Sequence, residues 1–367
     1  MHPRFFAPHC LLLLTLSSWP ISSTLAQAPA RAGSATAPDS PRYAQRHEAM
    51  QFAQALAERR QWDADWVRHT IGQARFLSRI PPLMLPSGPS GEKNWQAYRR
   101  RFVEPVRIRA GVRFWQQHRA SLAQAERRYG VPADIIVGIM GVETLYGRQM
   151  GNFRVIDALA TLAFDFPAAH PRAAARQAYF QGELEQLLAL SQQNGIDPLQ
   201  PRGSYAGAMG LGQFMPSSWV RYAVDGDGDG QIDLFGNAQD AIHSVANYFI
   251  AHGWQPGLPT HYPLQLDPAG VDLSTLLAPD IRPSFSAHEL AEHGVQLDPA
   301  GQNHNGLLAL IELKNGPQPP SYVAGTDNFY AVTRYNWSSY YALAVIELGQ
   351  AVRKEMQQPR PLTRLPR

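Results

Sequence analysis

Residues 131–166 read VPADIIVGIMGVETLYGRQMGNFRVIDALATLAFDF, and this stretch decides the fold. Pro132 suits the first position of a helix, where its missing N–H costs nothing, and Asp134 favours the positive end of the helix dipole. The residues that follow, from 135 to 142, are apolar on nearly every face of that helix. A short helix that is apolar all round is typically buried, so we expect this one to lie inside the protein.

Glu143 interrupts the apolar run at the end of the expected helix. Surrounding hydrocarbon disfavours the anionic form of a carboxyl group, so the pKa of Glu143 should be raised. A Glu with a raised pKa can serve as a general acid at neutral pH. The plain alternative is a Glu that forms an ion pair with Arg148 or Arg154.

The chain has 367 residues, which is enough for two or three domains with a sizeable core. Its formal net charge is +3, and the basic residues are scattered rather than gathered in a dense run. This distribution does not indicate nucleic-acid binding, although it allows weak attraction to an acidic polymer.

The N-terminus has the pattern of a secretory signal peptide over residues 1–28. Arg4 supplies the positive end, residues 11–16 begin an apolar run, and the tripeptide AQA offers a cleavage site. The run is too short to span a membrane. Cys10, the only cysteine, precedes the run, so a lipid anchor is not supported and the mature chain would have no disulfides. We expect a soluble periplasmic protein that begins with a disordered linker, 29–42.

Helical spacing recurs along most of the remaining chain. We expect further helices over 43–60, 62–77, 95–129, 156–164, 172–193, 240–254 and 329–352. Between 255 and about 321, Pro, Gly and short apolar runs dominate, which predicts short strands and loops. The Pro- and Arg-rich end, 361–367, is expected to be frayed. The fold class is therefore mainly α (α+β).

Five motifs follow one another along the chain: GVETLYG around Glu143, ALATLAFDFP, GSYAGAMGLGQFMPSSW, SVANYFIAHGW and NFYAVTRYN. Together and in this order they resemble the membrane-bound lytic murein transglycosylase B family, over roughly residues 43 to 352. The resemblance implies a lysozyme-like α-helical core domain, 131–254, with a flanking α domain, 43–130, that the C-terminal helix 338–360 completes, and a small β-containing domain, 255–337.

The family cleaves the β-1,4 bond between MurNAc and GlcNAc of peptidoglycan and leaves a 1,6-anhydro-MurNAc end. By this resemblance Glu143 is the single acid/base: it protonates the glycosidic oxygen and then deprotonates the MurNAc C6 hydroxyl, which attacks C1. Ordinary glycosidases need a second carboxylate. Asp157 and Asp165 are nearby in the sequence, but we interpret both as capping or turn residues. Their absence from catalysis fits a route in which the substrate's N-acetyl group stabilises the developing cation.

The resemblance also assigns residues to the substrate cleft. In the block 203–218, the glycines would let the backbone approach a ligand closely, or would serve as packing contacts. Gln213 has the alternative of capping a helix through Ser217. Tyr248 lies off the apolar stripe of its helix, where its hydroxyl can point at Glu143 or the ring can occupy an ordinary rim position. The implied substrate-binding set is Ser204 near the MurNAc N-acetyl group, Gln213 near the sugar at the cleavage point, Tyr248, Tyr98, Tyr179, Phe214, Tyr335 and Asn336.

The loop 225–240 begins DGDGDGQIDLF and resembles a calcium-binding EF-hand. Asp225, Asp227 and Asp229 fall at positions 1, 3 and 5, and Gln231 offers its carbonyl at position 7. Position 12 lacks the bidentate Glu, so a later carboxylate would close a longer loop, as in the family's variant EF-hand. We expect a structural Ca²⁺, against the alternative of a plain Asp-Gly turn, and no cofactor for catalysis. The expected ligands are Asp225, Asp227, Asp229, Gln231 and Asp240.

Two other functions remain open from the sequence: a lysozyme-type muramidase that hydrolyses the same bond, and a non-catalytic peptidoglycan-binding scaffold. Product analysis separates the first, because only transglycosylation gives an anhydro end. The presence of Glu143, Ser204 and Gln213 together with Tyr248 argues against the second. The expected partners are peptidoglycan strands and other cell-wall enzymes; we expect a monomer with no nucleic-acid partner and no transmembrane segment.

Overall fold

Contacts divide the chain into two units, which we describe separately. The computed structural model describes residues 41–86 and 93–358. The predicted signal peptide, nearly all of the predicted linker and the predicted frayed tail lie outside the described residues. No helix within the described residues is long and apolar enough to cross a membrane. The first unit takes residues 41–86, 151–208 and 215–217, and the second takes 93–150, 209–214 and 218–358.

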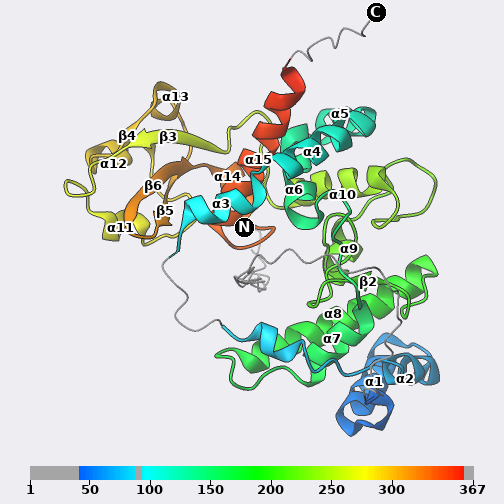
Figure 1. Ribbon diagram of the computed structural model, residues 1–367. Coiled ribbons are helices and arrows are strands. Elements are labelled where there is room, and N and C mark those ends of the chain that lie inside the picture. Colours follow the sequence, from blue (N-terminus) through cyan, green and yellow to red (C-terminus); the bar gives the residue numbers. More distant parts are fainter. Residues whose placement is uncertain (1–40, 87–92, 359–367) are drawn as a thin grey trace, which may run out of the picture. The chain divides into compact units, whose positions relative to one another are not determined.

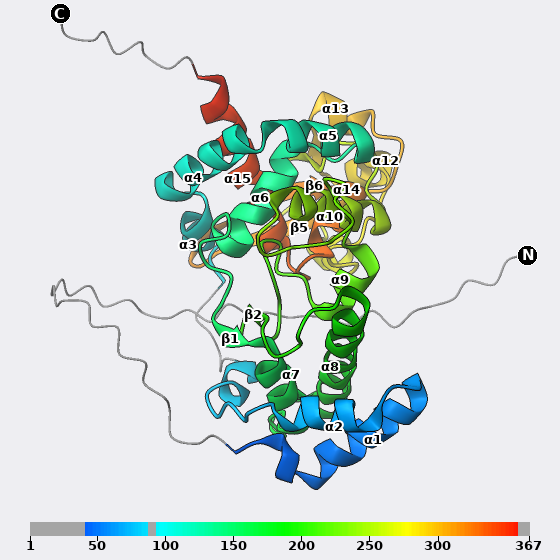
Figure 2. The same cartoon turned by 90° about the vertical axis from the view of Figure 1, so that its right-hand side faces the viewer.

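The first unit is built around two helices, α7 (Val155–Phe164) and α8 (Ala173–Asn194), which lie side by side (Figure 2). Every residue of α7 is buried, which confirms the buried helix expected there. The other elements of this unit are the 3₁₀ helices η1 (Tyr43–Gln45) and η2 (Pro81–Met84), the helices α1 (His47–Arg60) and α2 (Ala64–Gly72), and the antiparallel pair β1 (Phe153–Arg154) and β2 (Arg202–Gly203).

The two aspartates near α7 have structural partners inside the first unit. Asp157 forms an ion pair with Arg154 at 2.6 Å, and Asp165 forms one with Arg46 at 2.9 Å. Asp165 also accepts a hydrogen bond from the hydroxyl of Tyr43 at 2.6 Å. Both carboxylates therefore tie segments of this unit together, in line with a structural reading of these residues.

The second unit is organised around α6 (Ala133–Thr144), in which every residue except Glu143 is buried. Pro132 is the N-cap of this helix rather than its first residue. The C-terminal helix α15 (Ser339–Gln357) packs along α6 (Figure 1). The other helices of this unit are α3 (Trp95–Phe102), α4 (Pro105–Gln117), α5 (Arg119–Tyr129), α10 (Ala238–Ala251), α14 (Asp327–Thr333) and most of α9 (Pro216–Tyr222).

Two helical regions are broken where the sequence analysis expected continuity. The region 95–129 forms three helices. The first break falls at Pro105, which has no N–H to continue a helix, and Glu104 caps the new helix by accepting N–H groups of its first turn. The second break falls at His118. The region 329–352 ends at Thr333 and restarts at Ser339, where the side chain of Ser338 accepts the N–H of Tyr341. The segment between these two helices belongs to the site described below.

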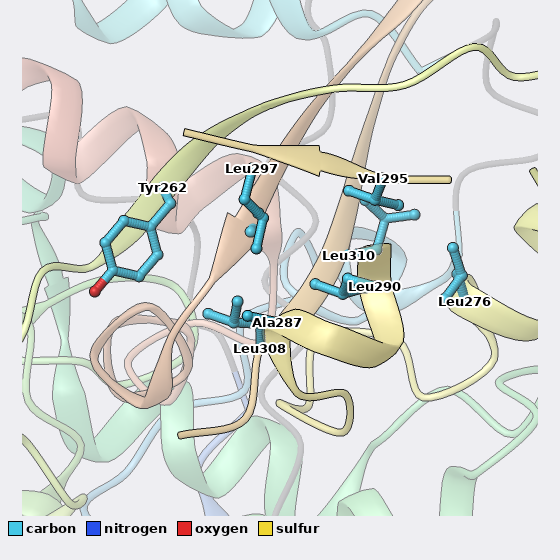
Figure 3. Close-up of a cluster of buried hydrophobic side chains, with 9 residues drawn as sticks. Tyr262, Leu276, Ala287, Leu290, Val295, Leu297, Leu308 and Leu310 are labelled. Carbon is cyan, nitrogen blue, oxygen red and sulfur yellow. The ribbon is translucent and has the colours of Figure 1, made fainter. Parts of the chain in front are cut away.

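Strands gather in the segment that the composition marked as β-containing. The strands β3 (His261–Gln265), β4 (Gln296–Leu297), β5 (Ala309–Asn315) and β6 (Gln318–Gly325) form an antiparallel sheet in the order β4-β3-β6-β5. Three short helices accompany it: α11 (Leu273–Leu277), α12 (Ala287–Glu292) and α13 (Pro299–Gln302). Figure 3 shows the apolar cluster that holds them together, in which Leu290, Leu308 and Leu310 are almost completely buried. The mixture of short strands and loops expected from the sequence is confirmed.

The two units cut across the domain boundaries expected from the sequence. Helices α1 and α2 belong to the first unit, whereas α3, α4 and α5, expected in the same α domain (43–130), contact α6 or α15 in the second. The β-sheet also belongs to the second unit. Grouping by contacts does not define which segments fold independently, so the three-domain division stays a prediction.

Candidate active site

Glu143 lies in the last turn of α6, at the only position of that helix that is not fully buried. Helices α6 and α15 approach each other closely because each presents a glycine to the other. A side-chain carbon on Gly138 would overlap the carbonyl oxygen of Val345, and one on Gly349 would overlap that of Asp134. This close packing places residues of α15 beside the end of α6.

Tyr341 of α15 binds Glu143 directly. Its hydroxyl donates a hydrogen bond to Oε1 of Glu143 at 2.5 Å. Burial holds the pKa of Tyr341 well above 10, so the hydroxyl stays protonated and remains a donor. Burial also raises the pKa of Glu143 to about 7, and the hydrogen bond from Tyr341 acts in the opposite direction by stabilising the carboxylate.

The raised pKa expected for Glu143 is therefore confirmed, and the alternative of an ion pair is not. Arg154 pairs with Asp157 instead. Within residues 41–86 and 93–358, no basic side chain comes within ion-pairing distance of Glu143. A carboxyl group with a pKa near neutrality and a single neutral donor is suited to giving up a proton and taking it back.

Tyrosine rings surround the carboxyl group. Tyr335 stacks on Tyr341 with 6.5 Å between ring centroids, and its hydroxyl donates to the carbonyl of Gly212 at 2.6 Å. Tyr98 lies among the rings of α3 and α15. Burial is the main cause of the raised pKa of Tyr98 and of Tyr335, and the negative charge of Glu143 raises both further. Tyr335 is linked to the carboxylate through Tyr341, on which it stacks.

Tyr248 does not point its hydroxyl at Glu143, which corrects one expectation. The hydroxyl donates to the carbonyl of Arg334 at 2.7 Å, and the ring stacks on His252 with 3.9 Å between centroids. Phe214 is 2% exposed and its ring packs against those of Tyr248 and Tyr335. Both side chains thus have protein partners, as buried hydroxyls and rings usually do. Tyr248 and Phe214 form the wall behind the tyrosines nearest Glu143.

The turn after Glu143 is unusual and firmly held. Leu145 and Tyr146 both have positive φ angles, 51° and 57°, a conformation that costs each side chain energy unless its surroundings enforce it. The hydroxyl of Thr144 donates to the carbonyl of Leu211 at 2.9 Å and accepts the N–H of Gly147 at 2.9 Å. The ring of Tyr146 packs on Phe114. These contacts fix the end of α6 and thereby the direction of Glu143.

The glycine-rich block behaves differently from its expected role. Side-chain carbons added at Gly203, Gly207 or Gly210 would collide with the carbonyl of Ala208, the side chain of Leu159 or the carbonyl of Leu234. These glycines are packing contacts, which was the alternative interpretation, rather than positions where the backbone is exposed to a ligand. Close approach of neighbouring protein atoms, of the backbone or of a side chain, requires glycine there.

Gln213 and Ser204 use their side chains to hold their own loops. The amide of Gln213 donates to the carbonyl oxygens of Met150 (3.2 Å) and Gly210 (3.0 Å), so it does not cap a helix through Ser217. The hydroxyl oxygen of Ser204 accepts the N–H of Ala208 at 3.0 Å. Gln213, Tyr98, Phe214, Tyr248, Tyr335 and Asn336 belong to the same unit as Glu143, while Ser204 and Tyr179 belong to the first unit.

Comparisons with known proteins agree on one family. The Transglycosylase SLT domain family matches residues 44–350. This chain belongs to that family. Over 325 residues it is 41% identical to the membrane-bound lytic murein transglycosylase B of Escherichia coli (strain K12), with 84% of each protein covered.

Two solved structures extend the match to the fold. The Escherichia coli lytic transglycosylase SLT35, in complex with calcium, superposes with a TM-score of 0.76 at 40% identity, covering 87% of this chain and 96% of that one. SltB3 from Pseudomonas aeruginosa, in complex with NAG-anhNAM-pentapeptide, superposes with a TM-score of 0.69 at 32% identity, covering 83% and 79%. The protein is a lytic transglycosylase, a member of a class of lyases that act on peptidoglycan. The predicted fold, mainly helical and lysozyme-like, is confirmed.

The sequence analysis missed Tyr341 as a site residue of this transglycosylase. It gave only a helix over 329–352, in which Tyr341 stands close to Leu343 and Val345. A signal was present, because a buried Tyr nearly always needs a partner for its hydroxyl and these apolar neighbours offer none. The partner comes from a helix about 200 residues earlier, at Glu143.

The acidic loop of the transglycosylase brings three carboxylates together. One oxygen from each of Asp225, Asp227 and Asp229 lies within 4.8 Å of the others. Asp225 accepts the N–H groups of Gly230 (2.8 Å) and Gly228 (2.6 Å), and these hydrogen bonds lower its pKa. Three oxygens held this close in a glycine-rich turn fit a hard cation such as Ca²⁺.

Asp240 plays a second part in the same loop. Its two carboxylate oxygens accept the N–H groups of Gly226 and Asp233, both at 2.7 Å, and its side chain is almost completely buried. Burial raises its pKa, and the charges of Asp227 and Asp225 raise it further. The side chain of Asp240 thus closes the loop by binding backbone N–H groups at both ends, and it is not one of the three clustered carboxylates.

Proposed function

We propose that this enzyme cleaves the β-1,4 bond between MurNAc and GlcNAc in peptidoglycan and leaves a 1,6-anhydro-MurNAc end, with Glu143 as the single acid/base. The observation that carries the proposal is the setting of Glu143: one carboxyl group, with a pKa of about 7, held by the hydroxyl of Tyr341. The anhydro sugar bound to the relative SltB3 supports the product.

The chemistry needs two proton transfers, one from Glu143 and one back to it. Protonated Glu143 gives its proton to the glycosidic oxygen, and the bond between C1 of MurNAc and that oxygen breaks. The resulting carboxylate then takes the proton of the C6 hydroxyl, and O6 attacks C1 to close the anhydro ring. The side chain ends protonated, as it began, so no water and no second carboxylate enters the balance.

A route in which the substrate stabilises its own developing cation is supported by the partners of the nearby carboxylates. Asp157 and Asp165, the carboxylates nearest in sequence, already have structural partners in the first unit. A positive charge that develops at C1 can instead be stabilised by the N-acetyl group of MurNAc. Burial of the carboxyl group of Glu143 raises its pKa toward the working pH.

The substrate-binding residues follow from their places around Glu143. Tyr98, Tyr335 and Asn336 would line the cleft, while Tyr248 and Phe214 would support it from behind. Tyr341 is a positioning residue for the acid. Gln213 would lie near the sugar at the cleavage point. Ser204, near the MurNAc N-acetyl group, and Tyr179 are proposed from the family resemblance alone.

A calcium ion would have a structural role. Asp225, Asp227 and Asp229 would hold it with the carbonyl of Gln231 and with Asp240, and it would neutralise carboxylates that otherwise repel one another. The complex of the relative SLT35 with calcium supports this assignment. The chemistry at Glu143 needs no cofactor.

The proposed place of action is the periplasm, reached through the N-terminal signal peptide, where the protein would work as a monomer on glycan strands, alongside other cell-wall enzymes. Digestion of purified peptidoglycan, followed by mass spectrometry of the muropeptides, tests the function. Products one water lighter than hydrolysis products, with anhydro ends, are expected. Reducing ends alone would indicate a lysozyme-type muramidase, and no release at all would indicate a scaffold.

A further inference from the structure

A pocket of about 510 Å³ lies on the first unit and is lined by α2, by the end of α8 and by the loop that follows α8. Gly195 ends α8 in a left-handed conformation, with a φ of 63°, so the chain turns there instead of continuing the helix. The catalytic residue and the residues proposed for the cleft and the metal are not part of this lining. The residues that line the pocket are Trp66, Ser191, Gln192, Gly195, Ile196, Asp197 and Pro198.

The loop that lines the pocket is held in shape by its own hydrogen bonds. The hydroxyl of Ser191 donates to the carbonyl of Ile196, and the carbonyl of Ser191 accepts the N–H of Ile196 at 3.2 Å. The carboxylate of Asp197 accepts the N–H of Leu199 at 2.9 Å and the side-chain amide of Gln200 at 3.1 Å. The pocket is therefore preorganised, which lowers the entropic cost of binding a ligand.

Trp66 offers an aromatic surface and a hydrogen-bond donor to the pocket. Its side chain is half-buried, and its ring meets that of Trp62 edge-on with 6.1 Å between centroids, which holds the indole in place. Among residues 41–86 and 93–358, neither the indole N–H of Trp66 nor the exposed amide of Gln192 donates to a protein group. Free N–H donors beside an aromatic ring suit a ligand that is apolar on one face and hydroxylated at its rim.

The charges of the lining narrow the class of ligand. Asp197 is the one charged residue among the described residues that line the pocket, and a carboxylate repels anions. A pyranose ring is neutral: its C–H groups form an apolar face for Trp66, and its hydroxyl groups can bond the Gln192 amide and the carboxylate of Asp197. The volume lies within the range usual for small-molecule sites, roughly 300–1,000 Å³. It leaves room for a sugar unit.

We propose that this pocket binds an uncharged amino sugar of the glycan strand, through residues distinct from those around Glu143. The proposal rests on the proposed function, because that function supplies the glycan as the ligand. A strand of many sugars can occupy both sites at once, which raises its effective affinity, whereas a fragment that fills the cleft alone gains nothing from the pocket. The pocket therefore favours long strands over short fragments.

The binding test uses tetra-N-acetylchitotetraose, which has no MurNAc and cannot form an anhydro end. The sugar is added to Glu143→Gln, and the indole N–H signals are followed by NMR, with that of Trp66 assigned by its loss in Trp66→Phe. We expect the Trp66 signal to shift and saturate at millimolar sugar, and Gln192→Ala to weaken this binding by roughly three- to tenfold. No shift of this signal up to about 10 mM sugar would overturn the site.

A matched variant and a turnover assay separate the pocket from the cleft. Gln192→Ala should lower kcat/KM on whole sacculi by roughly three- to tenfold and leave a soluble tetrasaccharide of the strand within about twofold. Gln193→Ala removes the next exposed amide, which does not line the pocket, and should change neither substrate nor chitotetraose binding. Melting curves check that both variants are folded.

Two results of these assays would overturn the pocket as a sugar site: equal losses on both substrates in Gln192→Ala, or equal effects of Gln192→Ala and Gln193→Ala. Failure of the wild type to form anhydro ends from either substrate would refute the proposed function instead. The two failures are distinguishable because chitotetraose binding is measured without turnover.

Discussion

The end of α6 and the acidic loop 225–240 hold the same chemical group in opposite surroundings. Glu143 is a single carboxyl group among tyrosine rings, and burial raises its pKa to about 7. Asp225 is a half-buried carboxylate beside two exposed ones, and the backbone N–H groups of Gly230 and Gly228 lower its pKa. The first can exchange a proton at neutral pH, and the second stays charged and is available to a cation. Surroundings, rather than residue type, separate catalysis from metal binding in this chain.

The two regions also respond in opposite ways to pH. The raised pKa of Glu143 means that the folded state binds more protons than the unfolded state between about 4.5 and 7. Its contribution to stability is complete below the unfolded value and is lost as the pH rises through 7. The lowered pKa of Asp225 contributes stability above its ordinary value, and that contribution is lost as the pH falls.

Replacing Glu143 should cause the largest loss of turnover among the changes proposed for the two regions. Glu143→Gln keeps the shape and the partner of the side chain but cannot give and retrieve a proton. We expect release of anhydro-muropeptides to fall by about 10³-fold or more. Turnover near the wild-type level would show that Glu143 is not the acid.

A melting curve is the control for folding of this variant. Above pH 7 the wild type has to bury a charged carboxylate, whereas Glu143→Gln does not, so the variant should be at least as stable at pH 8. Below pH 4.5 this advantage should disappear. An Asp227→Asn variant in the exposed loop should keep full turnover in the same assay.

The close packing of α6 on α15 is what brings Glu143 to Tyr341, so disturbing it should have the next largest effect. Gly138→Ala places a methyl group against the carbonyl oxygen of Val345 and should cost about 1–3 kcal/mol of stability and several-fold in activity. The matched control is Gly182→Ala in α8, where nothing lies within 4 Å of the added carbon. That change should raise stability by about 0.5–1 kcal/mol, because it replaces a helical glycine. Equal effects in calorimetry would contradict the role given to close packing.

Removing the partner of Glu143 should have a smaller effect with a definite sign. Tyr341→Phe deletes the hydrogen bond that lowers the pKa of Glu143, so burial alone remains and the pKa should rise. The pH profile of kcat should move its alkaline limb to higher pH, with about a two- to tenfold loss of rate. Tyr340→Phe, at the neighbouring half-buried position whose hydroxyl donates to the carbonyl of Lys314, is the control. A profile that keeps its limb in Tyr341→Phe would show that this hydroxyl does not tune the acid.

The sequence was sufficient for those features that depend on local pattern. The all-round apolar run from 135 to 142 predicted the buried helix, and the interruption at Glu143 predicted an acid with a raised pKa. The DGDGDG repeat predicted carboxylates in one turn. Each of these signals lies within about 15 residues, where helical or turn geometry relates positions directly.

The remaining features depend on contacts between distant segments. Tyr341 was not singled out because its partner is far away in the chain. Glu143 was only one possible partner for the hydroxyl of Tyr248, because helical spacing gives a direction but not a partner. The glycines of the block 203–212 face neighbouring backbone and side chains instead of a ligand, which only their packed surroundings reveal. Glycine permits close approach without specifying what approaches.

Loss of one loop carboxylate should have the smallest effect and should leave catalysis intact. With free Ca²⁺ ten- to a hundredfold above its dissociation constant, a folded-state site adds about 1.4–2.7 kcal/mol to the free energy of unfolding. Because position 12 lacks a bidentate Glu, we expect a dissociation constant of roughly 10⁻⁴ to 10⁻³ M, so about 10 mM Ca²⁺ is the working concentration.

Asp227→Ala removes one of the three clustered carboxylates and the partner of the Asn237 amide at 2.8 Å, and it should lose most of the stabilisation by Ca²⁺. The measurement is the melting temperature of wild type and variant with chelator and with Ca²⁺, and Asp267→Ala, in an exposed turn of the β-containing part, should keep the full shift. Equal shifts in wild type and Asp227→Ala would place the calcium site elsewhere, and the contrast between a proton-exchanging end of α6 and a cation-binding loop would then fail.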